Sequence, residues 1–333
     1  MTFHPGILAL LLGSALIASM LCYCAYEGMR IIRNWNIRSG SELQLELERR
    51  TYLISMVMSY ALGFELLSLF LFIYTADSMS SLFVGAMCAA GSLKVNGFGY
   101  PALILKIAGF LLSGMWLIVN FTDNQASDYP LIKTKYGLLI VITPFLVAEA
   151  LVQGTYLLSL KPDVITSCCG TIFNTDANTV LSGLIGLPRA LSQTVFYSST
   201  AITLLLGLVF YLKGKWAFAF SLSTLISFPL SIIALISFIS VYFYELPTHH
   251  CPFCVLHAEY GYVGYLLYLT LLAGVVSGLG FGAITPFRNV KSLAEVLPRI
   301  QRRLALISML SYGAFMLISG YGILFSHLSL SAY

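Results

Sequence analysis

The sequence predicts an all-α integral membrane protein, a polytopic bundle of about eight transmembrane helices. Of its 333 residues, 58% are hydrophobic and only 10% are charged, whereas a soluble domain carries roughly 25% charged residues. The mean hydropathy is +0.87. A bilayer crossing needs about 20 mostly apolar residues in helical form, because backbone N–H and C=O groups find no water there. Long apolar segments therefore indicate the crossings.

Eight segments meet this requirement, and we expect them to form one membrane domain over residues 1–333. We expect an N-terminal four-helix half over 1–160 and a C-terminal four-helix half over 161–333. No phosphate-binding glycine loop and no separate soluble domain is recognisable. The expected crossings are 7–29, 52–74, 102–121, 136–160, 194–212, 216–243, 263–284 and 304–325.

Basic residues gather in alternate connections between these segments. Of the 18 Lys and Arg residues, only Lys94, Lys106, Lys161 and Arg189 lie outside the odd-numbered connections. Cytoplasmic loops carry an excess of Lys and Arg, so both termini are expected to be extracytoplasmic, in the inner (cytoplasmic) membrane. The net charge of +4 follows from this topology and indicates no nucleic-acid partner. The residues in the odd connections are Arg30, Arg33, Arg38, Arg49, Arg50, Lys133, Lys135, Lys213, Lys215, Arg288, Lys291, Arg299, Arg302 and Arg303.

The seven cysteines divide into two groups under this topology. Cys22 and Cys24 lie deep in the first segment and are most simply packing residues. The others fall in even-numbered connections, and all five histidines lie at or beyond the outer helix ends. We therefore expect an extracytoplasmic group of reactive cysteines: Cys88, Cys168, Cys169, Cys251 and Cys254.

The motif Cys251-Pro-Phe-Cys254 is the strongest chemical signal. We expect it at a helix start, where exposed N–H groups and the positive dipole end stabilise a thiolate. Its spacing allows cycling between dithiol and disulfide by exchange with a third thiol. The same residues also suit a metal, with His257 and His249 or His250 completing the ligands. A structural disulfide is a third interpretation.

The order of motifs from 167 to 284 resembles the vitamin K epoxide reductase family and quinone-linked membrane disulfide oxidoreductases. Ser167-Cys168-Cys169-Gly170 is followed by Leu184-Ile185-Gly186-Leu187-Pro188, two helices and the Cys251–Cys254 motif. The resemblance implies that Cys168 or Cys169 relays electrons to Cys251, with Cys254 nearest a quinone. The family separates its loop cysteines, which are adjacent here, and it has four or five helices. The resemblance covers about a third of the chain.

Cys88 stands in a similar setting in the first half. A short polar run and Gly97-Phe-Gly-Tyr-Pro101 follow it before the next apolar segment. This pattern indicates either a degenerate internal repeat or ordinary turn chemistry. In either case Cys88 is a candidate extra thiol that exchanges with Cys168 and Cys169.

Five further residues are candidates for cofactor binding. Glu65 and Glu149 lie near the middle of apolar segments, where a charge is costly. They either carry protons or are protonated and hydrogen-bonded to neighbouring helices. Phe253, His257 and Tyr260 surround the cysteine motif, where aromatic rings either anchor helices at the interface or wall a flat apolar pocket.

The sequence thus favours a membrane thiol:disulfide oxidoreductase that moves electrons between extracytoplasmic cysteines and a membrane quinone. Its expected partners are the lipid bilayer and an extracytoplasmic thiol or disulfide protein. One alternative is a protein that handles a metal ion or haem, with Cys251, Cys254, His257 and His250 as ligands. A second alternative is a transporter or a membrane-anchor subunit of a respiratory complex.

Overall fold

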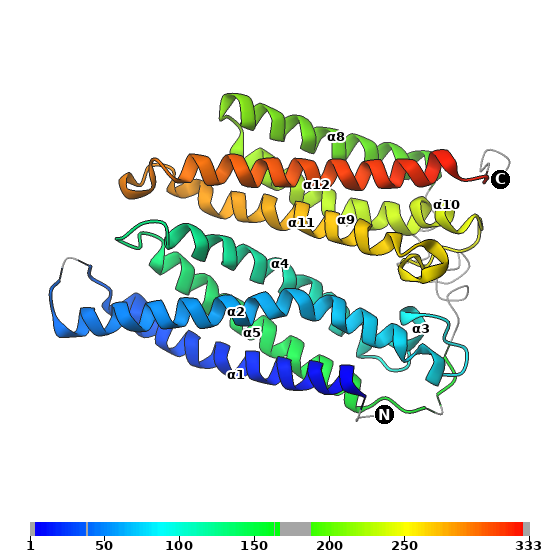
Figure 1. The fold of residues 1–333 in the computed structure, drawn as a ribbon, viewed down its shortest axis with the longest axis horizontal. Coiled ribbons are helices and arrows are strands. Elements are labelled where there is room, and N and C mark those ends of the chain that lie inside the picture. The colour runs from blue at the N-terminus through cyan, green and yellow to red at the C-terminus, as the bar shows by residue number, and fades with distance from the viewer. Residues whose placement is uncertain (1–3, 38, 163, 167–187, 329–333) are drawn as a thin grey trace. The chain divides into compact units, whose positions relative to one another are not determined.

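The computed structural model describes residues 4–37, 39–162, 164–166 and 188–328 (Figure 1). Within these residues the regular elements are helices, and the only extended pairing is one isolated bridge between Val84 and Ile165. Eight helical stretches in this part of the chain are long and apolar enough to cross a membrane. The predicted fold class, a multi-pass helical membrane protein, is confirmed. The predicted orientation of the termini stays a prediction.

The membrane-length stretches follow the predicted segments, and most of them extend beyond these at one or both ends. Short helices occupy the connections: α3 (Ala89–Leu93), η3 (Cys254–Leu256), η4 (Ala258–Tyr260), η5 (Thr285–Phe287) and η6 (Lys291–Leu293). The long elements are α1 (Pro5–Asn34), α2 (Glu42–Ser78) with η1 (Ser80–Leu82), α4 (Gly99–Asp123), α5 (Ile132–Leu158), α8 (Arg189–Lys213), α9 (Ala217–Ala234) with η2 (Leu235–Ile239) and α10 (Ser240–Tyr244), α11 (Val263–Ile284) and α12 (Leu297–Phe325).

The described residues form two compact units. Unit 1 comprises Met1–Thr75, Asn96–Lys161 and Ala283–Gln301, and unit 2 comprises Ala76–Val95, Pro162–Gly282 and Arg302–Tyr333. The segment that carries Cys88 therefore belongs to unit 2, together with the Cys251–Cys254 motif, although it lies in the first third of the sequence.

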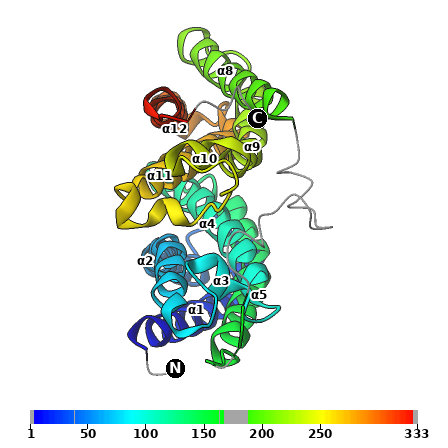
Figure 2. The same cartoon turned by 90° about the vertical axis from the view of Figure 1, so that its right-hand side faces the viewer.

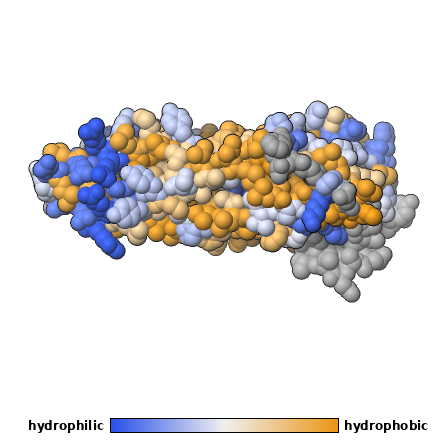
Figure 3. Space-filling model, turned by 90° about the horizontal axis from the view of Figure 1, so that it is seen from below, coloured by the Kyte–Doolittle hydropathy of each residue, from blue (hydrophilic) through white to orange (hydrophobic). Residues whose placement is uncertain are grey.

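In unit 1, α5 packs along both α1 and α4 (Figures 1 and 2). Helix α1 buries residues at helical spacing, including Leu10, Ile17 and Leu21, while Leu12 and Leu16 are exposed. A helix that is apolar on both faces is typical of a membrane span, because one face packs on protein and the other contacts lipid. Figure 3 shows hydrophobic side chains over much of the visible surface.

In unit 2, α8 packs along α9 (Figure 2). Helix α9 contains Pro229 and continues into a π-helical turn, η2. Proline removes a backbone donor and a π turn leaves a carbonyl oxygen available for another partner. The core around this turn is aromatic, with edge-to-face contacts of Phe196 with Phe238 and Phe315.

One basic residue departs from the charge pattern used to orient the chain. Lys135 was assigned to a solvated connection, but it lies in α5, where its side chain is 0% exposed. Its Nζ atom is 2.7 Å from Asp123 Oδ2 and 3.0 Å from Ser55 Oγ. Lys135 therefore neutralises a buried carboxylate within unit 1 and is no evidence about a cytoplasmic loop.

Candidate functional site

Three cysteines from two distant segments of unit 2 form a buried cluster. The Sγ atoms of Cys88, Cys251 and Cys254 all lie within 4.8 Å of one another. Cys88 Sγ and Cys251 Sγ are 3.5 Å apart, which is a hydrogen-bond contact and longer than a covalent sulfur–sulfur bond. Cys88 and Cys251 are 0% exposed and Cys254 is 7% exposed. The structure thus brings the candidate extra thiol to the Cys251–Cys254 motif.

The backbone around Cys88 is held by Thr166. The Thr166 N–H donates to the Val84 carbonyl at 2.9 Å, and its hydroxyl donates to the Gly91 carbonyl at 3.0 Å. Gly85 has φ +90°, and a side chain there would overlap the Thr166 carbonyl oxygen. The Cys88 segment is therefore fixed against the residues that precede Cys168 in the sequence. Cys168 and Cys169 themselves lie outside the described residues.

The expected position of the motif at a helix start is wrong. Cys254 opens the three-residue 3₁₀ turn η3, and α11 begins only at Val263. The chain between them contains Gly261 and Tyr262, both with positive φ. The dipole of a long helix therefore does not begin at this motif, and other groups must set the properties of its thiols.

Two tyrosines hold the backbone of the motif. The Tyr244 hydroxyl donates to the Cys251 carbonyl at 2.5 Å, and the Tyr268 hydroxyl donates to the Pro252 carbonyl at 2.6 Å. Tyr244 comes from α10 and Tyr268 from α11, so the two flanking helices fix two adjacent residues, one each. Buried hydroxyl groups need such partners, and here they also orient Cys251 toward Cys88.

Asp77 links the two cysteine segments. Its Oδ1 atom accepts the Ala89 N–H at 2.9 Å and lies 2.9 Å from His257 Nε2. Ala89 follows Cys88, and His257 follows the motif, so a single carboxylate fixes both. Sequence reasoning missed Asp77, although an acidic residue at the end of an apolar segment is a signal that could have singled it out.

The two histidines before the motif differ in their surroundings. His250 Nδ1 lies 3.0 Å from the Ile236 carbonyl in the π turn, and this nitrogen carries the proton because a carbonyl only accepts. Burial lowers the pKa of His250 below its usual value. Burial also lowers the pKa of His249, and the negative charge that Cys88 can carry opposes that shift. Both imidazoles are therefore neutral near pH 7.

The aromatic candidates lie beside the same cluster. Phe253 is buried, and the Tyr260 ring packs edge-to-face on Tyr244 with ring centroids 4.7 Å apart. Burial raises the pKa of the Tyr260 hydroxyl, so it remains a neutral donor. The Tyr260 ring thereby supports the tyrosine that holds Cys251.

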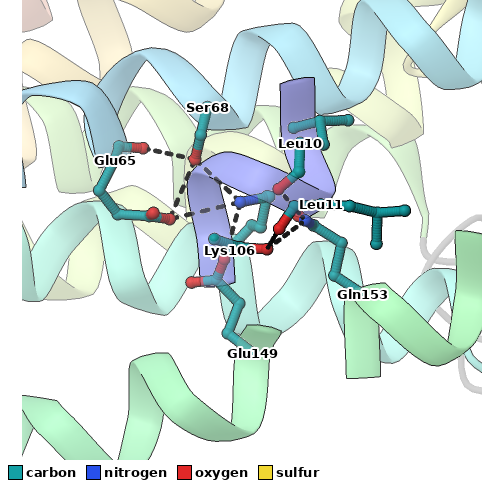
Figure 4. A network of polar contacts seen from close by, with 8 residues as sticks. Leu10, Leu11, Glu65, Ser68, Lys106, Glu149 and Gln153 are labelled. Carbon is teal, nitrogen blue, oxygen red and sulfur yellow. Dashed lines mark hydrogen bonds and ion pairs between the residues drawn. The ribbon is translucent and has the colours of Figure 1, made fainter. Parts of the chain in front are cut away.

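The two glutamates belong to unit 1, in a network of buried polar groups (Figure 4). Lys106 Nζ lies 3.3 Å from Glu65 Oε1 and 2.7 Å from Glu149 Oε1. Of the five candidate cofactor residues, Phe253, His257 and Tyr260 therefore fall in unit 2 with the cysteines. Sequence reasoning missed Lys106, although a basic residue inside an apolar span is itself a signal.

The cluster can perform two kinds of chemistry. Neighbouring thiols can exchange disulfide bonds, and three sulfur atoms can hold a soft metal ion. The expected metal ligands His250 and His257 contact Ile236 and Asp77, so Cys88 takes their place as the third donor. Cys22 and Cys24 lie in α1 of unit 1, away from this cluster in the sequence and in a different unit.

Comparison with known proteins identifies no family for this chain. The chain matches no protein-family model, no curated protein and no solved structure. The resemblance of 167–284 to the vitamin K epoxide reductase family stays a prediction.

Proposed function

We propose that this protein is a membrane thiol:disulfide oxidoreductase in which Cys88 exchanges disulfide bonds with Cys251 and Cys254. The observation that carries the proposal is the 3.5 Å separation of Cys88 Sγ and Cys251 Sγ. A disulfide bond is about 2.05 Å long, so a movement of about 1.5 Å joins the two atoms. Cys254 is close enough to act as the leaving or resolving thiol.

The exchange conserves electrons and atoms. The Cys88 thiolate attacks Cys251 Sγ of a Cys251–Cys254 disulfide, so a Cys88–Cys251 bond forms while the Cys251–Cys254 bond breaks. Cys254 leaves as a thiolate and takes up a proton. The reverse attack by Cys254 on Cys251 releases Cys88, so electrons can pass in either direction.

The proton of Cys88 needs an acceptor, because the thiolate is the nucleophile. The neutral imidazole of His249, whose pKa the charge of Cys88 would raise, is the proposed acceptor of this proton. Asp77 acts as a positioning residue, because it fixes the backbone beside Cys88 and the ring of His257 together.

The two ends of the electron path are assigned to a quinone and to a thiol protein. Oxidation of the Cys251 and Cys254 thiols gives a disulfide, and the quinone takes two electrons and two protons to become a hydroquinone. At the other end, Cys168 or Cys169 passes electrons between Cys88 and an extracytoplasmic thiol protein. The sequence resemblance supports this path, and so do the hydrogen bonds of Thr166 to the Cys88 segment.

Quinone-dependent loss of thiols tests the proposal. The purified full chain is reduced without oxygen, mixed with a soluble quinone, quenched in acid and denatured, and its maleimide-reactive cysteines are counted over time. Wild type should lose thiols in pairs, whereas Cys254→Ser should not lose the motif pair. Cys22→Ser is the matched control, because Cys22 is an exposed cysteine in α1. Wild type that keeps all its thiols after quinone is added would reject the proposal.

A thiolate metal site is the second candidate. Sulfurs that share one Zn²⁺ ion at about 2.3 Å are about 3.8 Å apart, and the three sulfurs here lie within 4.8 Å of one another. Sulfur donors favour Zn²⁺ or Cu(I). One bound metal ion per chain that is lost in Cys88→Ser, with no response to quinone, would favour this function over disulfide exchange.

A further inference from the structure

Unit 1 contains a buried group of three charged residues that the thiol chemistry does not use. Lys106 of α4 lies between Glu65 of α2 and Glu149 of α5 (Figure 4). Its ammonium group also donates to Ser68 Oγ at 2.8 Å. The side chains of the three charged residues are only 1–3% exposed. We call Glu65, Lys106 and Glu149 the charged trio.

The charges of the trio do not balance. With all three groups ionised, two carboxylates and one ammonium leave a net charge of −1 among apolar helices. An uncompensated buried charge is strongly destabilising. The Lys135–Asp123 pair of the same unit is balanced one to one and equally buried. The trio therefore requires one further positive charge, and the balanced pair does not.

Two unsatisfied acceptors show where that charge fits. Among the described residues, Glu149 Oε2 is buried without a hydrogen-bond partner, and so is Gln153 Oε1. The two residues are one helical turn apart on α5, a spacing that lets their side chains meet. A proton on Glu149 removes the negative charge from a buried oxygen that no donor reaches in the described part of the chain. The Gln153 amide N–H₂ group is already held by the Leu10 carbonyl and Ser14 Oγ of α1.

The other carboxylate is less suited to the proton. Glu65 Oε1 lies 3.3 Å from Lys106 Nζ and 3.0 Å from Ser68 Oγ, whose single proton is shared with the Glu65 carbonyl, and both groups favour its ionised form. The charged groups that act on Glu149 are Lys106 and Glu65. Helix α1 contributes the Leu10 carbonyl and Ser14 Oγ to the neighbouring Gln153. Gly109 of α4 leaves room for Glu149 Oε2, because a Cβ atom there would lie 2.6 Å from it.

We infer that the charged trio is a binding site for one exchangeable proton, held on Glu149 Oε2. Binding converts a net charge of −1 to zero, with Glu65 ionised, Lys106 protonated and Glu149 neutral. Release of the proton to water leaves the ion pair of Lys106 with both carboxylates. This site lies wholly in unit 1, and its existence does not depend on the cysteine chemistry of unit 2.

Infrared spectroscopy of the full chain in lipid vesicles tests the inference. Wild type should show the C=O stretch of one protonated carboxyl per chain that shifts in D₂O and disappears at high pH. Glu149→Gln should lose this band. Lys106→Met should double it, because both carboxyls must then be protonated. The double variant Lys135→Met/Asp123→Asn is the control, since it removes a balanced pair and should keep the band.

The inference is overturned if wild type lacks the band at every pH, or if Glu149→Gln retains it. If the trio binds a metal cation instead, Na⁺ should stabilise wild type against unfolding, choline should not, and no protonated carboxyl should be seen. This result would also reject the proton-binding site. Should the variants fail to fold, the isotope shift and pH titration of the wild-type band decide the question.

Discussion

Cys88 Sγ and Cys251 Sγ lie 3.5 Å apart although 163 positions separate the two residues in the sequence. If this contact is where disulfide exchange occurs, removing the resolving thiol should trap the intermediate. Mild oxidation of Cys254→Ser should give about one Cys88–Cys251 disulfide per chain, because no neighbouring thiol of the motif remains to break it. Peptide mapping by mass spectrometry without reduction identifies the linked peptides.

The matched variant for this experiment is Cys88→Ser. It should form the Cys251–Cys254 disulfide and no bond between the two segments. A Cys254→Ser protein that stays fully reduced, or that links Cys251 only to other chains, would contradict the proposed exchange.

The membrane spans were predictable because hydropathy is a local property. Each crossing needs a run of apolar residues whatever its neighbours are, and all eight long stretches of the described residues follow such runs. The helix ends were less predictable. A 3₁₀ turn and residues with positive φ separate the Cys251–Cys254 motif from α11. Nothing in the sequence predicts a positive φ at Tyr262, because tyrosine rarely adopts this conformation.

The site itself was predictable only in part. Cys88, Cys251 and Cys254 were singled out by residue type, but their contact depends on how a segment of residues 76–95 joins unit 2. Glu65 and Glu149 were recognised as costly charges, whereas Lys106 was counted only as a basic residue outside the main loops. Pairing across helices is a tertiary property, so hydropathy along one chain cannot show it.

Asp77 offers a test of how the two cysteine segments are held together. Asp77→Ala removes the acceptor of both Ala89 N–H and His257, and we expect a stability loss of about 1–2 kcal/mol. Asp77→Asn keeps a carbonyl oxygen for Ala89 and should lose about half as much. Thermal unfolding in detergent gives the stabilities, and quinone-dependent thiol loss should slow in both variants. Equal stability of the two variants would show that the Ala89 bond contributes nothing.

The histidines predict how stability depends on pH. The pKa of His249 and His250 is lowered by burial in the folded protein, so the unfolded chain binds more protons at acid pH. Their contribution to the free energy of unfolding is present above the usual histidine pKa of about 6.5, and it is lost as pH falls below that value. The unfolding temperature of wild type should therefore drop between about pH 7 and about pH 5.

Replacing His250 by a residue that does not titrate tests this account. Gln at position 250 retains an N–H donor for the Ile236 carbonyl, so His250→Gln should show a smaller acid-induced drop than wild type. His327→Gln, which removes a histidine outside the cysteine cluster, serves as the control. An identical pH profile for His250→Gln and wild type would refute the role of burial at this residue.

Gly264 tests whether tight packing at the start of α11 positions the motif. A Cβ atom at Gly264 would lie 2.7 Å from Val255 Cγ2 and 2.9 Å from the Val255 carbonyl carbon and oxygen. Backbone cannot move aside as a flexible side chain can, so Gly264→Ala should cost about 1–3 kcal/mol. Val255 follows Cys254 directly, and the displacement should also raise the rate at which maleimide labels Cys254 in the folded protein.

The matched substitution is Gly313→Ala in α12, where an added Cβ meets no atom within 4 Å. Alanine favours a helix interior by up to about 1 kcal/mol over glycine, so this variant should be as stable as wild type or more stable, with unchanged labelling. If Gly264→Ala matches Gly313→Ala in stability and in the rate of maleimide labelling, the segment that bears Cys254 has room to shift. Disulfide exchange with Cys88 would then need no precise backbone support from α11.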